Sequence, residues 1–89
     1  MRQGFVSRIK ATNDSDVARI WSLVDNLSKI IQLLDCDILA EEERVLVFDP
    51  QDIAYPMLAR TLRTRRDNLK ATIAMLKLQV GAIEAQSAA

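Results

Sequence analysis

The residues best suited to binding chemistry are a group of cations in the second half of the chain. Arg63, Arg66 and Lys70 recur at steps of three and four, so a helix would place them on one flank, with Arg60 one turn earlier. A row of cations can hold phosphate groups. Arg60, Arg63, Arg66 and Lys70 are therefore a candidate nucleic-acid or acidic-partner surface. We favour the alternative that this flank pairs with an acidic helix of the same protein, because no aromatic residue is interleaved.

Arg65 occupies a different place on the same predicted helix. Its helical angle falls at the edge of the apolar stripe, where an unpaired charge is costly to bury. We expect it to extend into solvent, or to meet Asp25, Asp35 or Asp37 of the facing helix in an ion pair that sets the register. The other interpretation is a cationic ligand site inside a helical bundle, which is the basis for a small enzyme, the function we rank last.

Residues for catalysis and metal binding are few. The chain has no histidine, so the usual proton shuttle near neutral pH is missing. One cysteine cannot complete a four-ligand zinc site, and acidic residues on both sides of Cys36 disfavour a nucleophilic thiolate. There is no Gly-rich phosphate loop. We therefore predict a non-enzymatic protein with no catalytic residues, no cofactor and no metal.

Length and charge indicate a small single domain that needs a partner. A chain of 89 residues buries only about 60–65% of its unfolded surface, and a lone cysteine excludes an intrachain disulfide. The 12 basic and 12 acidic side chains balance, but their distribution is uneven. Residues 13–43 hold eight acids and two bases, whereas residues 57–89 hold six bases and two acids. The two halves should attract each other, although each exposed pair contributes only about 0–1 kcal/mol.

The start of the chain and its hydropathy bear on its location. Residues 1–12 have no apolar core of the kind that a secretory signal requires. No apolar run approaches the roughly 20 residues of a membrane span. A single unpaired cysteine suits a reducing compartment. We expect a cytoplasmic protein with no membrane partner.

Two long helices account for most of the chain. The acids and amides of residues 13–16 are a good helix start, and the helical period then continues without Gly or Pro to about residue 43. We expect an extended or partly disordered segment at 1–12 and a helical hairpin domain at 13–89. Its parts are a helix at about 14–43, a connector at about 44–55 and a second helix at about 56–85.

The connector leaves several local structures open. Residues 45–48 are β-branched and aromatic, so they suit an extended link, a short strand that pairs with residues 4–6, or one more helical turn. Asp49 and Pro50 form a second helix start. Pro56 then follows, so either a short turn ends near Ala54 and the main helix begins at Pro56, or one helix kinks there.

The apolar pattern predicts an all-α fold in which an antiparallel hairpin dimerises into a four-helix bundle. Between Val17 and Ile38 apolar residues alternate at steps of three and four, with β-branched residues at one position and mainly Leu at the other. Leu23 and Ile30 widen this stripe, so a second neighbour should cover them. The rival is a parallel coiled coil of two first helices. The predicted interface core is Val17, Ile20, Leu23, Val24, Leu27, Ile30, Ile31, Leu34, Ile38, Leu62, Leu69, Ile73, Leu76 and Val80.

These features favour a homodimeric protein-interaction module, an adaptor, regulator or assembly factor that also binds another protein. The alternative function is a nucleic-acid-associated regulator that uses the basic flank. Trp21 lies off the main stripe, where it either anchors a partner or packs under a neighbouring segment. We expect Tyr55, at the bend, to have a packing role.

Overall fold

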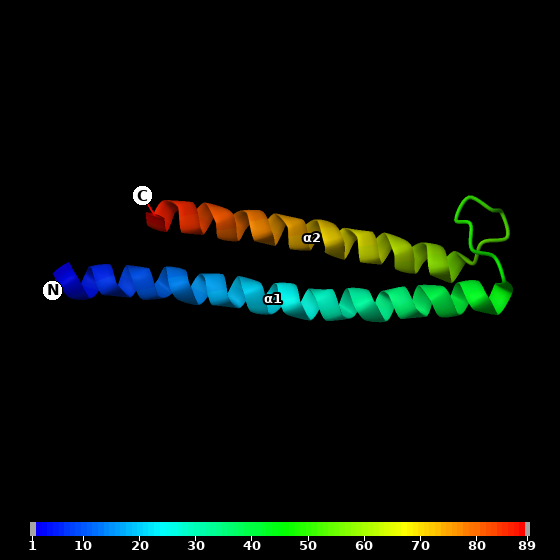
Figure 1. Cartoon of the computed structure of the whole chain (residues 1–89), viewed down its shortest axis with the longest axis horizontal. Coiled ribbons are helices and arrows are strands. Elements are labelled where there is room, and N and C mark those ends of the chain that lie inside the picture. Colours follow the sequence, from blue (N-terminus) through cyan, green and yellow to red (C-terminus); the bar gives the residue numbers. More distant parts are fainter. Residues whose placement is uncertain (1, 89) are drawn as a thin grey trace.

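The computed structural model of the protein describes the backbone of residues 2–88 and the side chains of residues 14–86. Two helices, α1 (Arg2–Val45) and α2 (Met57–Ala88), run antiparallel and pack against each other along their lengths (Figure 1). Between residues 2 and 88 the chain forms no strand. The molecule measures 66 × 18 × 14 Å, a single layer of two helices. The predicted all-α helical hairpin is confirmed.

The first helix is longer than the sequence indicated. It begins at Arg2 rather than at about residue 14, so its backbone includes most of the segment that we expected to be extended or partly disordered; residue 1 lies outside the described backbone. Residues 4–6 are helical and form no strand with residues 45–48. The capping side chains at 13–16 favour a helix start but cannot end a helix that arrives from before them, because no proline precedes them.

The connector is a short ordered loop at residues 46–56. α1 ends at Val45, and Leu46 follows in the left-handed region with a φ of 59°, the conformation that commonly ends a helix. Two side chains then fold the loop: the carboxylate of Asp49 accepts a hydrogen bond from the Gln51 amide and that of Asp52 accepts one from the Ala54 amide, each at 2.9 Å.

Pro56 lies directly before α2, which begins at Met57. Its carbonyl accepts the first helical bond, from the Arg60 amide at 3.1 Å. Of the two structures predicted here, a turn followed by a helix is confirmed, and no kinked helix spans the loop. The boundaries 57–88 agree closely with the predicted 56–85, and residue 89 lies outside the described backbone.

The seam between α1 and α2 follows a seven-residue repeat. In α1 the inward positions hold β-branched residues at one place and mainly Leu at the other, and every one of them between Val17 and Val45 is buried or half-buried. In α2 the matching series begins at Ala59 and ends at Ile83. Only a few of these side chains are truly buried: Val24, Leu34, Ile38, Ala59 and Val80. Two helices alone enclose little, and no large side chain of the described residues is fully buried.

Candidate functional site

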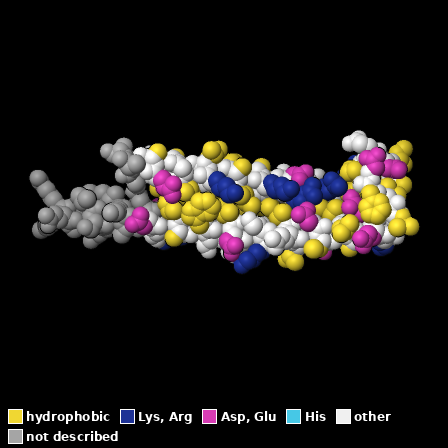
Figure 2. Space-filling view, viewed as in Figure 1, with side chains coloured by type: hydrophobic (Ala, Val, Ile, Leu, Met, Phe, Trp, Pro, Cys, Tyr) yellow, Lys and Arg dark blue, Asp and Glu magenta, His cyan; other side chains and the backbone are white. Residues whose placement is uncertain are grey.

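One side of the hairpin carries most of its interhelical charges, and we call it the charged flank. It comprises Asp35 and Glu42 of α1 and Arg63, Arg66, Lys70 and Lys77 of α2. Figure 2 shows the Lys and Arg side chains following one another along α2 beside the seam, with acidic side chains close to them. The predicted alignment of Arg63, Arg66 and Lys70 on one side of α2 agrees with this arrangement, and Lys77, seven residues after Lys70, continues it.

A hydrogen-bonded triad closes the loop end of the charged flank. The Tyr55 hydroxyl donates to Glu42 Oε2 at 2.8 Å, while Arg63 donates from Nε to Tyr55 Oη at 2.7 Å and from Nη2 to Glu42 Oε2 at 3.2 Å. Glu42 and Tyr55 are buried, with 6% and 5% of their surfaces exposed. Every buried polar side-chain atom between residues 14 and 86 has a partner. The triad therefore fastens the loop to both helices.

Burial and these contacts shift two ionisation equilibria in the triad. Desolvation, reinforced by the hydrogen bond to Glu42, raises the pKa of Tyr55 above its ordinary value of 10.0. The hydrogen bond to Tyr55, helped by the contact with Glu42, raises the pKa of Arg63. At neutral pH the triad therefore holds a neutral phenol and a charged guanidinium. Arg60 also lies over the Tyr55 ring, with its guanidinium carbon 5.6 Å from the ring centroid.

Arg66 makes the second interhelical ion pair. Its Nη1 lies 3.1 Å from Asp35 Oδ1, and its Nε lies 3.1 Å from Asp67 Oδ1. The hydrogen bond to Asp35 raises the pKa of Arg66, against the opposing effect of desolvation. Arg66, not Arg65, is thus the arginine that meets an acid of α1. Arg65 is exposed, and no acid within the described side chains pairs with it.

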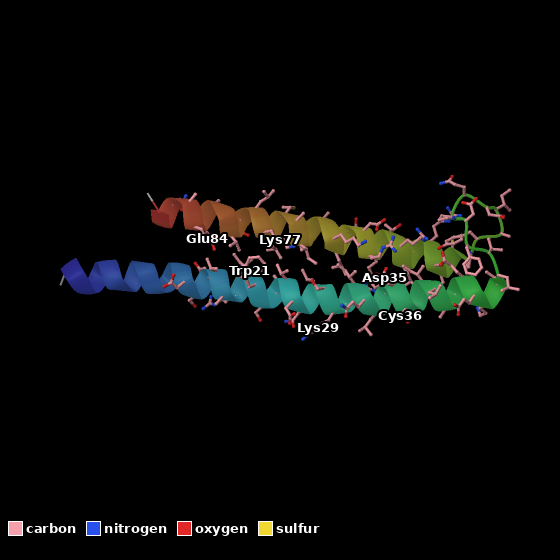
Figure 3. All side chains as sticks on the ribbon, in the orientation of Figure 1. Trp21, Lys29, Asp35, Cys36, Lys77 and Glu84 are labelled. Carbon is pink, nitrogen blue, oxygen red and sulfur yellow. The ribbon has the colours of Figure 1, made fainter. Side chains whose placement is uncertain are left out.

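The intramolecular pairing that we favoured for the basic flank is present in part. Arg63 and Arg66 pair with acids of α1, and Arg60 stacks on Tyr55. Within residues 14–86, Lys70 and Lys77 form no ion pair, although Lys77 is near Trp21 and Glu84 in Figure 3. Two of the four candidate phosphate-binding residues are therefore already held by carboxylates.

The opposite side of the hairpin presents several exposed apolar side chains, with Asp37 and Arg65 among them, and we call it the apolar flank. On α1 it presents Leu23, Ile30 and Leu33, and on α2 it presents Leu58 and Met75, all exposed. Two depressions lie on the described surface; the first is lined by residues of both helices and the second by residues of α2 alone. One is lined by Asp37 and Ala40 of α1 together with Leu58 of α2, and the other by residues 72–79 around Met75. Ile30 and Leu23 precede Asp37 by one and two heptads, so they continue the same surface.

The predicted interface core divides into two groups. Twelve of its residues lie in the seam between α1 and α2: Val17, Ile20, Val24, Leu27, Ile31, Leu34, Ile38, Leu62, Leu69, Ile73, Leu76 and Val80. Leu23 and Ile30 lie outside the seam, 45% and 43% exposed. The sequence analysis did not include Leu33, Leu58 or Met75 in this set. The seven-residue repeat could have identified them. Leu58 occupies a repeat position next to the seam, and Leu33 and Met75 lie one helical turn after such positions.

The remaining candidates have separate positions. Trp21 is partly exposed, and Figure 3 shows it at the groove between the helices, near Lys77 and Glu84. Cys36 is exposed and, like Lys29, points away from α2 (Figure 3). A further exposed apolar group surrounds the loop and consists of Leu46, Phe48, Ile53 and Met57.

Nothing in the described part of the chain groups three metal-binding side chains together, and neither described helix is both long and apolar enough to cross a membrane. Comparison with protein-family models, curated proteins and solved structures gives no match to this chain.

Proposed function

We propose that the protein is a non-enzymatic interaction module that acts as a homodimer, in which two hairpins bury their apolar flanks against each other as a four-helix bundle. The observation that supports this proposal most is the exposed row Leu23, Ile30 and Leu33 beside a seam that buries few side chains completely. A contiguous apolar surface of this kind marks an interaction site.

The exposed area is large enough for a stable dimer. The accessible surface is 6887 Å² for a 10.0 kDa chain. A compact monomer of that mass exposes about 5,200 Å², so this elongated chain, taken over all its residues, exposes about 1,600 Å² more. Two copies that covered this whole difference would bury about 3,200 Å² in total, an upper limit that lies within the range of obligate homodimers.

The test compares oligomeric state between matched variants. We expect the wild-type protein to have the mass of a dimer by light scattering at micromolar concentration. Ile30→Glu should shift it to a helical monomer, because Ile30 lies outside the seam and the charge would be buried in the proposed interface. Gln32→Glu, an exposed position on the same helix that faces away from the apolar flank, should leave the dimer intact. A monomeric wild-type protein would refute the proposal.

For a partner protein, the loop end is the surface that we propose. Leu46, Phe48 and Ile53 are exposed there on an ordered loop, and residues 41–53 hold five acids and one base. That charge fits a basic amphipathic segment. Fluorescence anisotropy should show such a peptide binding, with loss on Ile53→Ser and no binding of an acidic peptide of equal hydropathy. The one free cysteine fits the reducing cytoplasm, where we place the module.

A nucleic-acid-associated regulator is the second candidate, since Lys70 and Lys77 make no ion pair in the described residues. Binding to mixed DNA or RNA at low salt, weakened by added salt and by Lys70→Ala together with Arg66→Ala, would support it. Binding that ignores salt would exclude phosphate recognition by this flank.

A further inference from the structure

The structure limits how two hairpins can join, and this inference rests on the proposed dimer. Packing two apolar flanks face to face with two-fold symmetry allows two arrangements. In the same-end arrangement each α1 lies on the partner's α2, and both loops are at one end. In the opposite-end arrangement α1 lies on the partner's α1, α2 on the partner's α2, and the loops are at opposite ends.

The helices differ strongly in charge. Over its whole length α1 holds eight acids and six bases, but three of these bases (Arg2, Arg8 and Lys10) precede residue 14. From residue 14 to Val45 it holds eight acids and three bases, whereas α2 holds six bases and two acids. The opposite-end arrangement would place acidic helix on acidic helix and basic helix on basic helix. The same-end arrangement surrounds each acidic helix with two basic ones, so charge selects it.

One specific contact follows from the register of the hairpin. Arg63 pairs with Glu42 and Arg66 pairs with Asp35, so residues 35–42 of α1 lie level with residues 63–66 of α2. Asp37 lines the depression on the apolar flank with Leu58, and Arg65 follows Leu58 by one heptad on the same flank. Neither Asp37 nor Arg65 has an ion pair within residues 14–86. A two-fold axis parallel to the helices preserves the level of every residue, so it brings Asp37 of each copy opposite Arg65 of the other.

We propose that two copies dimerise in the same-end arrangement, with the carboxylate of Asp37 paired to the guanidinium of Arg65 in the second copy. The pair occurs twice in the dimer, once on each side of the axis. Asp37 shares its depression with Ala40, Glu41, Leu58 and Leu62, and an unmatched charge buried there would oppose assembly. The contact thereby favours the same-end arrangement over the opposite-end arrangement. In that arrangement the two loops lie at the same end of the dimer.

The contact is tested by exchanging charges between chains. Asp37→Arg alone and Arg65→Asp alone should each weaken dimerisation by about tenfold or more, because like charges then meet across the interface. An equimolar mixture of the two variants should form heterodimers with affinity near that of the wild type, as measured by native mass spectrometry. Within either single chain the repulsion remains after mixing, so recovery can come only from contact between chains. Asp25→Arg, the same change on an exposed outward position, should leave dimerisation unaltered.

The orientation is tested by a distance between loops. With Cys36→Ser and Gln51→Cys, a spin label on each exposed loop should report about 20–30 Å in the same-end dimer, set by helix spacings of about 10 Å and label length. The opposite-end dimer would separate the labels by about 45 Å or more, the length of the 32-residue α2 at about 1.5 Å per residue.

The outcomes separate this inference from the proposed function. A dimer with a long label distance, or a mixture that stays dissociated, would overturn the same-end arrangement and leave the homodimer standing. A monomeric wild-type protein would remove both. A short distance together with recovery on mixing would establish the inference.

Discussion

Arg66 of α2 occupies a heptad position that apolar side chains fill elsewhere along the seam, and it reaches across to Asp35 of α1 at 3.1 Å. Its side chain is only 17% exposed, whereas that of Asp35 is 49% exposed. A charge held so close to the seam has a desolvation cost that its partner only partly offsets. The pair therefore contributes more to the register of the two helices than to their stability.

We predict unequal effects of substitution at this pair. Arg66→Leu should leave the stability unchanged or raise it, because a leucine would extend the seam without desolvating a charge. Asp35→Ala should destabilise the protein by about 1 kcal/mol, since Arg66 would lose its interhelical partner while still reaching solvent. Urea denaturation followed by circular dichroism at fixed protein concentration measures both. A large loss of stability in Arg66→Leu would contradict this assignment.

The buried triad should be far more sensitive. Glu42→Ala removes the acceptor of both Tyr55 and Arg63 and should destabilise the protein by about 1.5–3 kcal/mol, the usual range for hydrogen bonds that involve a charged group. The neighbouring Glu43 is exposed, so Glu43→Ala should change the free energy of unfolding by less than about 0.5 kcal/mol. An equal loss of stability in Glu42→Ala and Glu43→Ala would argue against a stabilising role of the triad.

The raised pKa of Tyr55 has a consequence at alkaline pH. The folded protein holds the neutral phenol, so the unfolded chain releases its proton first as the pH rises past 10.0. The contribution of Tyr55 to the free energy of unfolding is complete below pH 10.0. It is lost as the pH rises through the pKa that Tyr55 has in the folded protein. Tyr55 is the only tyrosine, so the ultraviolet absorbance of tyrosinate reports its ionisation directly. Tyr55→Phe should be less stable at neutral pH, and its stability should fall less steeply above pH 10.

Truncating a leucine in the seam should destabilise the protein more than truncating an exposed leucine. Leu34 is buried at 7% exposure, so Leu34→Ala should destabilise the protein by about 2–3 kcal/mol, the lower part of the range for leucine truncation because the core is thin. Leu39 is exposed and lies outside both the seam and the apolar flank, so Leu39→Ala should have a small effect. Thermal unfolding of the two variants at one concentration gives the comparison.

Gly81 offers a stabilising substitution. It lies within α2 with ordinary helical backbone, and a Cβ added there would meet nothing within 4 Å. Gly81→Ala should therefore raise the free energy of unfolding by about 0.5–1 kcal/mol, since alanine loses less backbone entropy in a helix. An increase in the melting temperature with an unchanged molar mass in solution would agree with this, and a decrease would indicate a contact at this position.

The apolar periodicity was sufficient to predict two long antiparallel helices and the residues between them, because steps of three and four define one face of a helix whatever surrounds it. It did not separate Arg65 from Arg66. A straight helix at 100° per residue drifts by about 20° in each heptad from the supercoiled repeat, and over α2 that drift moves the inward face by one residue. The start of α1 was misplaced for another reason, since capping preferences at residues 13–16 show where a helix can begin but do not require it to begin there.

The candidate surfaces depend on features that a single chain's pattern does not contain. Whether Leu23 and Ile30 are covered by a neighbour depends on how much area α2 takes from α1, which only the packed hairpin shows. The triad joins residues of α1, the loop and α2 that are 8 to 21 positions apart, and across a loop such spacing carries no information about contact.

The uneven placement of the interhelical polar contacts has a consequence for motion. Both ion pairs between α1 and α2, and the phenol that locks the bend, lie in the part of the hairpin nearest the loop. Farther from the loop, residues 14–34 of α1 and residues 67–86 of α2 are joined by side-chain packing alone. We therefore expect the two helices to separate first at the end away from the loop. Amide hydrogen exchange should accordingly become slower from the C-terminal end of α2 toward residues 59–66. During folding, the contacts between the helices should form first next to the loop and then progressively farther from it.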